Sequence, residues 1–148
     1  MYQLSTKGRY GTRFMYQLAK NHGKGPMLLK DIAAKENLSL KYMEQIIPSL
    51  KKAGLIKSLR GPYGGYVLLR EPDKIEMKTI LTALEGDIAP VHCVDEPDTC
   101  DRSKFCPSRQ VWHILEEQIN ETLSNITLKD MLKMGKNQEK ESEKGGTE

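Results

Sequence analysis

Three cysteines lie within fourteen residues of this 148-residue chain, at Cys93, Cys100 and Cys106, and the sequence contains no others. Thiolates are soft ligands that suit zinc or an iron–sulfur cluster. The segment between the first two is polar, so a thiol without a role there would be an exposed liability. The spacing is wider than the roughly two to four residues that separate paired cysteines in most structural zinc sites. The pattern favours an iron–sulfur cluster and leaves zinc or a bare thiol switch as alternatives.

A second group of residues could read DNA bases. Lys41, Tyr42, Glu44 and Gln45 follow one another closely after Ser39. A lysine can reach phosphate or guanine, a glutamate can accept from cytosine N4, and a glutamine can pair with adenine. A tyrosine can pack on the DNA backbone or on a thymine methyl group. We therefore predict a base-reading surface at residues 41–45.

Basic side chains that could bind phosphate are concentrated in the first half of the chain. Arg60 is followed by Gly61, which permits close approach to phosphates or to the minor groove. Lys7 and Arg9 are candidates for phosphate contacts that position the protein. Residues 1–70 carry a net charge of +10, whereas the remaining residues carry −7. This asymmetry favours a nucleic-acid partner, and a solvated basic surface with no partner is the alternative.

These residues need elements that position them. The helical spacing of apolar residues predicts helices over residues 10–18, 28–37 and 40–50, the last capped by Ser39. Two strand-like segments follow, and the turn between them is rich in Gly and Pro. The order helix, helix, turn, helix, hairpin is that of a winged helix-turn-helix. We expect a mainly α fold with a small β-hairpin wing at residues 56–69.

The second half is predicted to place the cysteines between two helices. A short helix is expected at residues 76–85, an irregular loop at 87–102, and a long amphipathic helix at 108–126. Thr127 and Asp130 resemble a capping box for a short last helix that ends near residue 134. The following residues include no apolar side chain and are predicted to be disordered. The expected divisions are a DNA-binding domain (1–72), the cysteine loop with its helices (73–134) and a tail (135–148).

Several classes of protein are not expected. No apolar run approaches the roughly 20 residues needed to cross a bilayer, and the N-terminus lacks a signal-peptide pattern. Few cysteines in a chain of this size fit a reducing cytoplasm. No nucleophile–base pair or cofactor-binding loop indicates an enzyme.

Four segments resemble the IscR-like iron–sulfur transcription regulators. They read LSTKGRYG near the start, SLKYMEQ, SLRGPYGGY and SNITLKDM, and the similarity covers roughly residues 1–134. The resemblance implies a homodimer that binds an imperfect palindrome in double-stranded DNA, with the long C-terminal helix forming much of the dimer contact. It also implies DNA-reading roles for Lys41, Tyr42, Glu44, Gln45 and Arg60.

The same resemblance implies that Cys93, Cys100 and Cys106 hold an iron–sulfur cluster, with [2Fe-2S] favoured over [4Fe-4S]. Such regulators can supply a His three residues after the third cysteine, but this chain has Arg109 there, which stays protonated and cannot ligate iron. Nitric-oxide-sensing relatives can use an N-terminal Asp, and the matching residue here is Arg9. The favoured fourth ligand is His92, and the other candidates are Asp95, Glu96, Asp98, Asp101 and His113.

We therefore expect a transcription regulator controlled by its cluster. The signal would be iron–sulfur status, oxidative stress or nitric oxide, and the iron–sulfur assembly machinery is a candidate partner. The alternative is a cluster-free regulator of the same family, working as a thiol switch or by docking a metabolic enzyme in cysteine metabolism.

Overall fold

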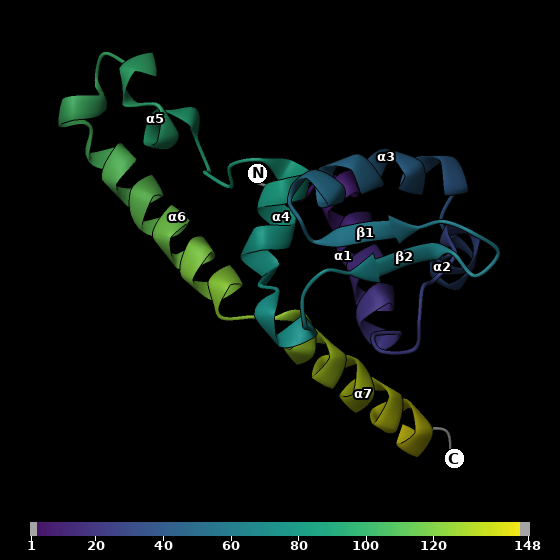
Figure 1. Cartoon of the computed structure of the whole chain (residues 1–148). Coiled ribbons are helices and arrows are strands. Elements are labelled where there is room, and N and C mark those ends of the chain that lie inside the picture. The colour runs from purple at the N-terminus through teal and green to yellow at the C-terminus, as the bar shows by residue number, and fades with distance from the viewer. Residues whose placement is uncertain (1–2, 146–148) are drawn as a thin grey trace.

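The computed structural model describes residues 3–145 and begins with a winged helix-turn-helix (Figure 1). Three helices come first: α1 (Thr6–Lys20), α2 (Leu29–Glu36) and α3 (Leu40–Lys52). The antiparallel strands β1 (Ile56–Leu59) and β2 (Gly65–Leu68) form the wing. The predicted fold class is confirmed.

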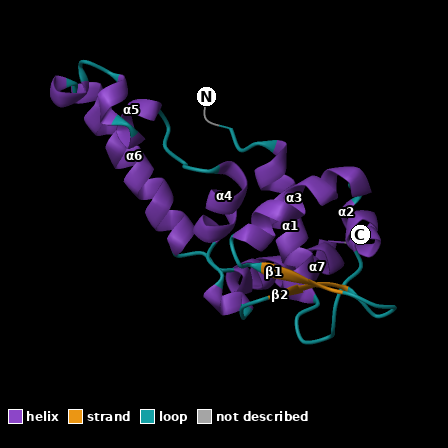
Figure 2. Cartoon of the chain, turned by 45° about the horizontal axis from the view of Figure 1, so that its top comes forward, coloured by secondary structure: helices purple, strands orange, loops and turns teal. Residues whose placement is uncertain are grey.

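The second half leaves this body and returns to it. Helix α4 (Met77–Glu85) is followed by the short α5 (His92–Asp95), two single-turn 3-10 segments, α6 (Pro107–Ser124) and α7 (Leu128–Gly145). Figure 1 shows α6 projecting away from the body with α5 at its far end, while α7 runs off on the opposite side. Figure 2 shows the same separation between the α5–α6 arm and the two-stranded wing. The cysteine loop therefore stands apart from the winged helix.

Local signals explain where the first helices begin and end. The Ser5 and Ser39 side chains accept hydrogen bonds from the amides of Gly8 and Tyr42, at 3.2 and 3.0 Å. Such caps satisfy amides that have no partner within the helix. Asn37 ends α2 in the left-handed conformation (φ 52°), which Asn tolerates better than most residues. The resulting short turn sets α3 against α2.

One hydrophobic core joins the two halves of the chain. Its fully buried side chains come from α1, α2, α3, β1, α4, the start of α7 and the connections before β1 and α4. They include Phe14, Met15, Ile32, Met43, Ile46, Leu50, Leu55, Ile56, Ile75, Ile80 and Leu128. Main-chain hydrogen bonds also join the start of α4 to the connection between α6 and α7: Met77 N–H donates to Ile126 O (2.8 Å) and Leu128 N–H to Ile75 O (3.0 Å). The core therefore crosses the boundary expected between residues 72 and 73.

Helix α7 is longer than the sequence predicted. Residues 135–145, expected to be disordered, continue the helix, while 146–148 lie outside the described residues. The segment is rich in Lys and Glu, which have high helix propensity, and it extends a helix already nucleated at Leu128. Gly135 lies against the Tyr16 hydroxyl, and Lys20 pairs with Glu139 at 3.6 Å.

Within residues 3–145, no helix combines the length and apolar character required to span a bilayer.

Candidate nucleic-acid interface and cysteine loop

Helix α3 presents a polar face to solvent. Lys41, Glu44 and Gln45 are exposed, and their spacing places them on one side of the helix. The opposite side is buried in the core through Met43, Ile46, Ile47 and Leu50. A helix held from behind in this way can offer its polar side chains to a DNA groove without rearrangement.

Tyr42 is less available than its neighbours. It is half-buried, and its ring meets the Tyr10 ring edge-on with 5.4 Å between centroids. The Arg9 and Arg13 guanidinium carbons lie 5.8 and 5.6 Å from the centre of the Tyr10 ring. Tyr42 therefore ties the start of α3 to α1, a packing role that the sequence did not reveal.

A partly buried polar clamp fixes the helix-turn-helix. Arg13 Nε of α1 donates to Glu36 Oε2 at 2.6 Å, and its guanidinium also donates to the Glu36 carbonyl oxygen. Gln17 is buried and donates its amide to the other carboxylate oxygen of Glu36. Because Glu36 is the last residue of α2, this clamp holds the turn that leads into α3.

The wing carries an exposed basic and aromatic tip. Arg60 and Gly61 are exposed, and Gly61 has φ +106°, a conformation that favours glycine. Tyr63, at the same tip, is 91% exposed. Sequence reasoning did not select Tyr63, although it lies within the RGPYGG turn. The tip can place a cation and an aromatic ring against a nucleic-acid backbone.

The two N-terminal basic candidates lie in different surroundings. Lys7 Nζ donates to Ser49 Oγ of α3 at 2.8 Å, so it lies beside α3. Arg9 instead borders an apolar groove of about 410 Å³, with side chains such as Leu4, Met77 and Leu123. Lys7 therefore contacts α3 directly, whereas Arg9 lies near the Tyr10 ring and borders this groove.

The cysteines lie along the loop between α4 and α6. Cys93 is in α5 and Cys106 directly precedes α6; both are half-buried, whereas Cys100 is exposed. His92, the favoured fourth ligand, is exposed on α5. Among the described residues, no three Cys, His, Asp or Glu side chains are grouped so that they could hold a metal ion. The thiols share a loop but do not converge.

Arg109 connects the loop to α6. Its Nε donates to the Cys93 carbonyl oxygen at 2.7 Å, and its guanidinium also reaches the Val94 carbonyl oxygen at 3.5 Å. Nearby, partial desolvation raises the pKa of Asp95, and the neighbouring Glu116 carboxylate raises it further. From the sequence, Arg109 was expected only to be unable to bind iron; its contact with α5 has no local sequence signal.

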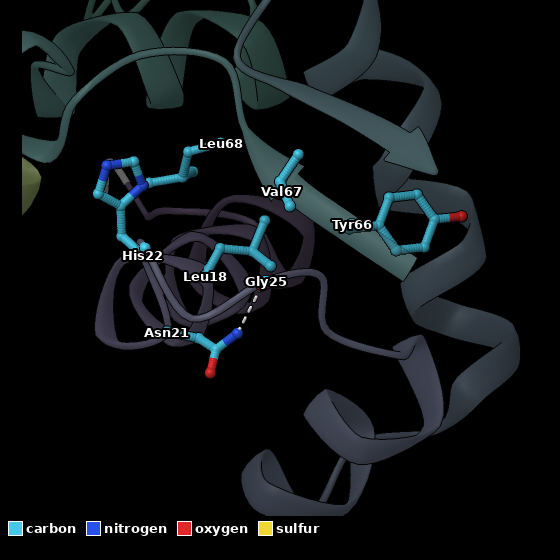
Figure 3. Close-up of a pocket in the computed structure, with 8 residues that line it drawn as sticks. Leu18, Asn21, His22, Gly25, Tyr66, Val67 and Leu68 are labelled. Atoms are coloured by element: carbon cyan, nitrogen blue, oxygen red, sulfur yellow. Dashed lines mark hydrogen bonds between the residues drawn. The ribbon is translucent and has the colours of Figure 1, made fainter. Parts of the chain in front are cut away.

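A further pocket of about 270 Å³ lies between the end of α1 and β2 (Figure 3). It is lined by residues that include Leu18, Tyr66 and His22, whose ring lies 2.9 Å from the Glu71 carboxylate. None of the sequence-predicted site residues borders it. The candidate site therefore comprises the α3 face, the wing and the cysteine loop.

Comparison with known proteins agrees with this architecture. A family model described as "Rrf2: Iron-dependent Transcriptional regulator" matches residues 4–134. The HTH-type transcriptional regulator CymR of Bacillus subtilis is 44% identical over 129 residues, which cover 87% of this chain and 88% of CymR.

Two solved structures are also similar. The structure of CymR, titled the global cysteine regulator of B. subtilis, has a TM-score of 0.74 and 45% identity, covering 88% of this chain and 96% of that one. The structure of T. potens IscR has a TM-score of 0.75 and 42% identity, covering 90% of this chain and 88% of that one.

Proposed function

Because this chain belongs to the Rrf2 family of DNA-binding transcription regulators, we propose that its α3 helix and wing read one half of a palindrome and that its cysteine loop controls this binding. The expected family resemblance is confirmed, as is the expectation that the protein is not an enzyme. The observation that carries the proposal is the exposed face of α3, which is polar and backed by a buried face.

Each exposed side chain has a chemical role in this proposal. Lys41 contacts phosphate or guanine, Glu44 accepts a hydrogen bond from cytosine, and Gln45 pairs with adenine. Arg60, carried by the wing beside Gly61, contacts phosphate or the minor groove. Replacing Glu44 with alanine should relax base preference, whereas replacing Arg60 should weaken binding and lower its salt dependence.

Helix α6 supports assembly as a homodimer. None of its residues is buried, although Val111, Trp112, Ile114 and Leu115 lie on it. An uncovered apolar surface of this kind marks a protein contact. In the dimer, α6 of a second copy covers these side chains. Sedimentation velocity of the wild type and of Ile114→Asp tests the assignment, because the charged variant should be monomeric.

The donor chemistry of the loop supports an iron–sulfur cluster held by Cys93, Cys100 and Cys106, with [2Fe-2S] favoured. Three thiolates are a suitable ligand set, but in this structure they do not converge. Metal sites commonly form only as the metal binds, so cluster assembly would organise the loop. When bound, the group would supply sensitivity to oxidants and nitric oxide. Arg109 holds the Cys93 carbonyl. His92 stays the favoured candidate for the fourth ligand, with Asp95, Glu96, Asp98, Asp101 and His113 as the others.

The second candidate is a cluster-free regulator, which two observations favour. A relative with 45% identity is described as a global cysteine regulator, and the thiols of this chain are not grouped as a metal site. In this reading the loop works as a thiol switch or as the docking point for a metabolic enzyme.

Anaerobic purification separates the two candidates. Visible absorption with matching iron and acid-labile sulfide, lost when each cysteine is replaced by alanine, would support the cluster. Colourless protein that still selects a palindrome from a random DNA library would support the cluster-free regulator. If the purified protein, whether coloured or colourless, selects no DNA sequence from the library, the proposed function is contradicted.

A further inference from the structure

Glu85 joins the start of the cysteine loop to the DNA-binding body. It is the last residue of α4, and its Oε1 accepts hydrogen bonds from Ser5 N–H at 2.9 Å and Ser5 Oγ at 2.6 Å. A Cβ at Gly8 would lie 2.1 Å from the same oxygen, so the carboxylate occupies the space that this glycine leaves open. The contact links residues that are 80 positions apart in the sequence.

The charge of Glu85 suits α1 rather than α4. A carboxylate at a helix C-terminus opposes the helix dipole, whereas one at a helix N-terminus is stabilising. Helix α1 has no acidic residue in its own first turn. Glu85 therefore supplies from another helix the negative charge that the start of α1 lacks.

Glu85 also faces the cysteine loop. It borders a hollow of about 390 Å³ whose other walls are loop residues, including His92 and Asp95. The next residue, Gly86, has φ +82°, and there the chain turns out of α4 into the loop. A change in loop geometry therefore acts first on the residue that holds the start of α1.

The first turn of α1 also contacts α3. Lys7, one residue before Gly8, donates from Nζ to Ser49 Oγ of α3 at 2.8 Å. Two hydrogen-bonded contacts thus connect the loop entrance with α3, through Ser5 at one end of the turn and Lys7 within it.

From these contacts we infer that Glu85 is a positioning residue that couples the state of the cysteine loop to the placement of α3. The inference rests on the proposed function, because it requires that the loop controls DNA binding. Coupling between two sites is measured as the ratio of DNA affinities in two loop states, and typical couplings are about 5- to 150-fold.

The experiment compares the dissociation constant for DNA in two preparations of each variant. One is the anaerobically purified protein; the other is the same protein after iron chelation and alkylation with iodoacetamide. Alkylation modifies the loop alone, because every cysteine of the chain lies there. The probe is the duplex that the wild type selects from a random library. We expect the two wild-type values to differ at least about fivefold.

Two variants remove the coupling in different ways. Glu85→Ala deletes the carboxylate, whereas Gly8→Ala keeps it but displaces it and introduces a better helix former. Both should bring the ratio of the two dissociation constants towards one. Glu85→Gln, which keeps an acceptor oxygen, should retain part of the wild-type difference between the two preparations. Glu71→Gln is the matched control, because it removes an exposed carboxylate that pairs with His22, and it should keep the wild-type ratio.

Thermal unfolding establishes whether each variant is folded. If Glu85→Ala does not fold, the comparison is made with Gly8→Ala and Glu85→Gln instead. A merely structural role would weaken DNA binding equally in both preparations and leave the ratio unchanged. A preserved ratio in Glu85→Ala and Gly8→Ala would therefore overturn the coupling while loop control stands. A wild-type ratio of one would overturn loop control, and the coupling with it.

Discussion

Replacing Glu36 with alanine should destabilise the helix-turn-helix far more than removal of an ordinary surface carboxylate. The Glu36 side chain is 11% exposed and accepts from both Arg13 and Gln17. In the variant the Gln17 amide, in a residue only 8% exposed, loses its acceptor. Arg13 is 42% exposed, so its guanidinium can turn to water and keep its bond to the main-chain carbonyl.

The expected magnitude follows from these exposures. A buried polar group left without a partner costs about 1–3 kcal/mol. Loss of an ion pair whose cation reaches solvent adds about 0–1 kcal/mol. The free energy of unfolding should therefore fall by about 1–4 kcal/mol, and for a chain of this size Tm should fall by about 3–12 °C.

Thermal unfolding of three variants checks this reasoning. Glu71→Ala is the control, because Glu71 is 70% exposed in its pair with His22, and it should stay within about 0.5 kcal/mol of the wild type. Adding Gln17→Met to Glu36→Ala removes the amide that has lost its acceptor, and it should recover part of the lost free energy of unfolding. If Glu36→Ala is as mild as Glu71→Ala, or if the double variant regains no stability, the clamp does not hold the helix-turn-helix as inferred.

Three further predictions concern the wing, α7 and the loop. Gly65→Ala should weaken DNA binding and destabilise the wing by about 1–3 kcal/mol, because φ is +142° and the new Cβ would lie 2.3 Å from the Met27 carbonyl oxygen; unchanged Tm would contradict this. Hydrogen bonds from the Thr127 amide and hydroxyl lower the pKa of Asp130 in the folded protein. The stabilisation of α7 by this cap is therefore fully present at pH values above the ordinary Asp pKa of about 3.9, and it is lost as pH falls through the lower pKa of the folded state. The Tm difference between the wild type and Asp130→Asn should therefore shrink in acid, and a constant difference would exclude the carboxylate as its cause. Arg109→Met should speed alkylation of the loop thiols while helical circular dichroism is retained, since α5 loses its hydrogen bonds to α6; unchanged rates would show that the contact does not restrain the loop.

Much of the fold could be predicted because its signals are local. Ser39 caps α3 as expected, and Thr127 with Asp130 forms the expected box, with Thr127 Oγ1 and the Asp130 carboxylate each bonded to the other residue's amide. The Gly- and Pro-rich turn formed the expected hairpin. Each of these features depends on residues within a few positions of one another, so the chain shows them without its tertiary structure.

The candidate site was predictable in its residue types and less so in its surroundings. Lys41, Glu44 and Gln45 are exposed as a DNA-reading role requires, since the helical period alone separates them from the buried face. Tyr42 has the same sequence neighbourhood, but it packs on Tyr10. No periodicity distinguishes an aromatic ring that faces solvent from one that meets a ring on another helix.

Composition and short-range spacing were enough to predict the three helices of the winged helix-turn-helix, the Ser39 and Thr127–Asp130 caps, the wing, the basic first half and the concentration of thiols in one loop. Three features are visible only in the folded chain: α4 and α7 complete the core of the winged helix, Arg109 holds α5, and Glu85 contacts the start of α1. These contacts join distant parts of the chain, and which polar groups meet depends on how the helices pack. Burial and the choice of polar partner are properties of the assembled core, whereas caps and periodicity are properties of neighbouring residues.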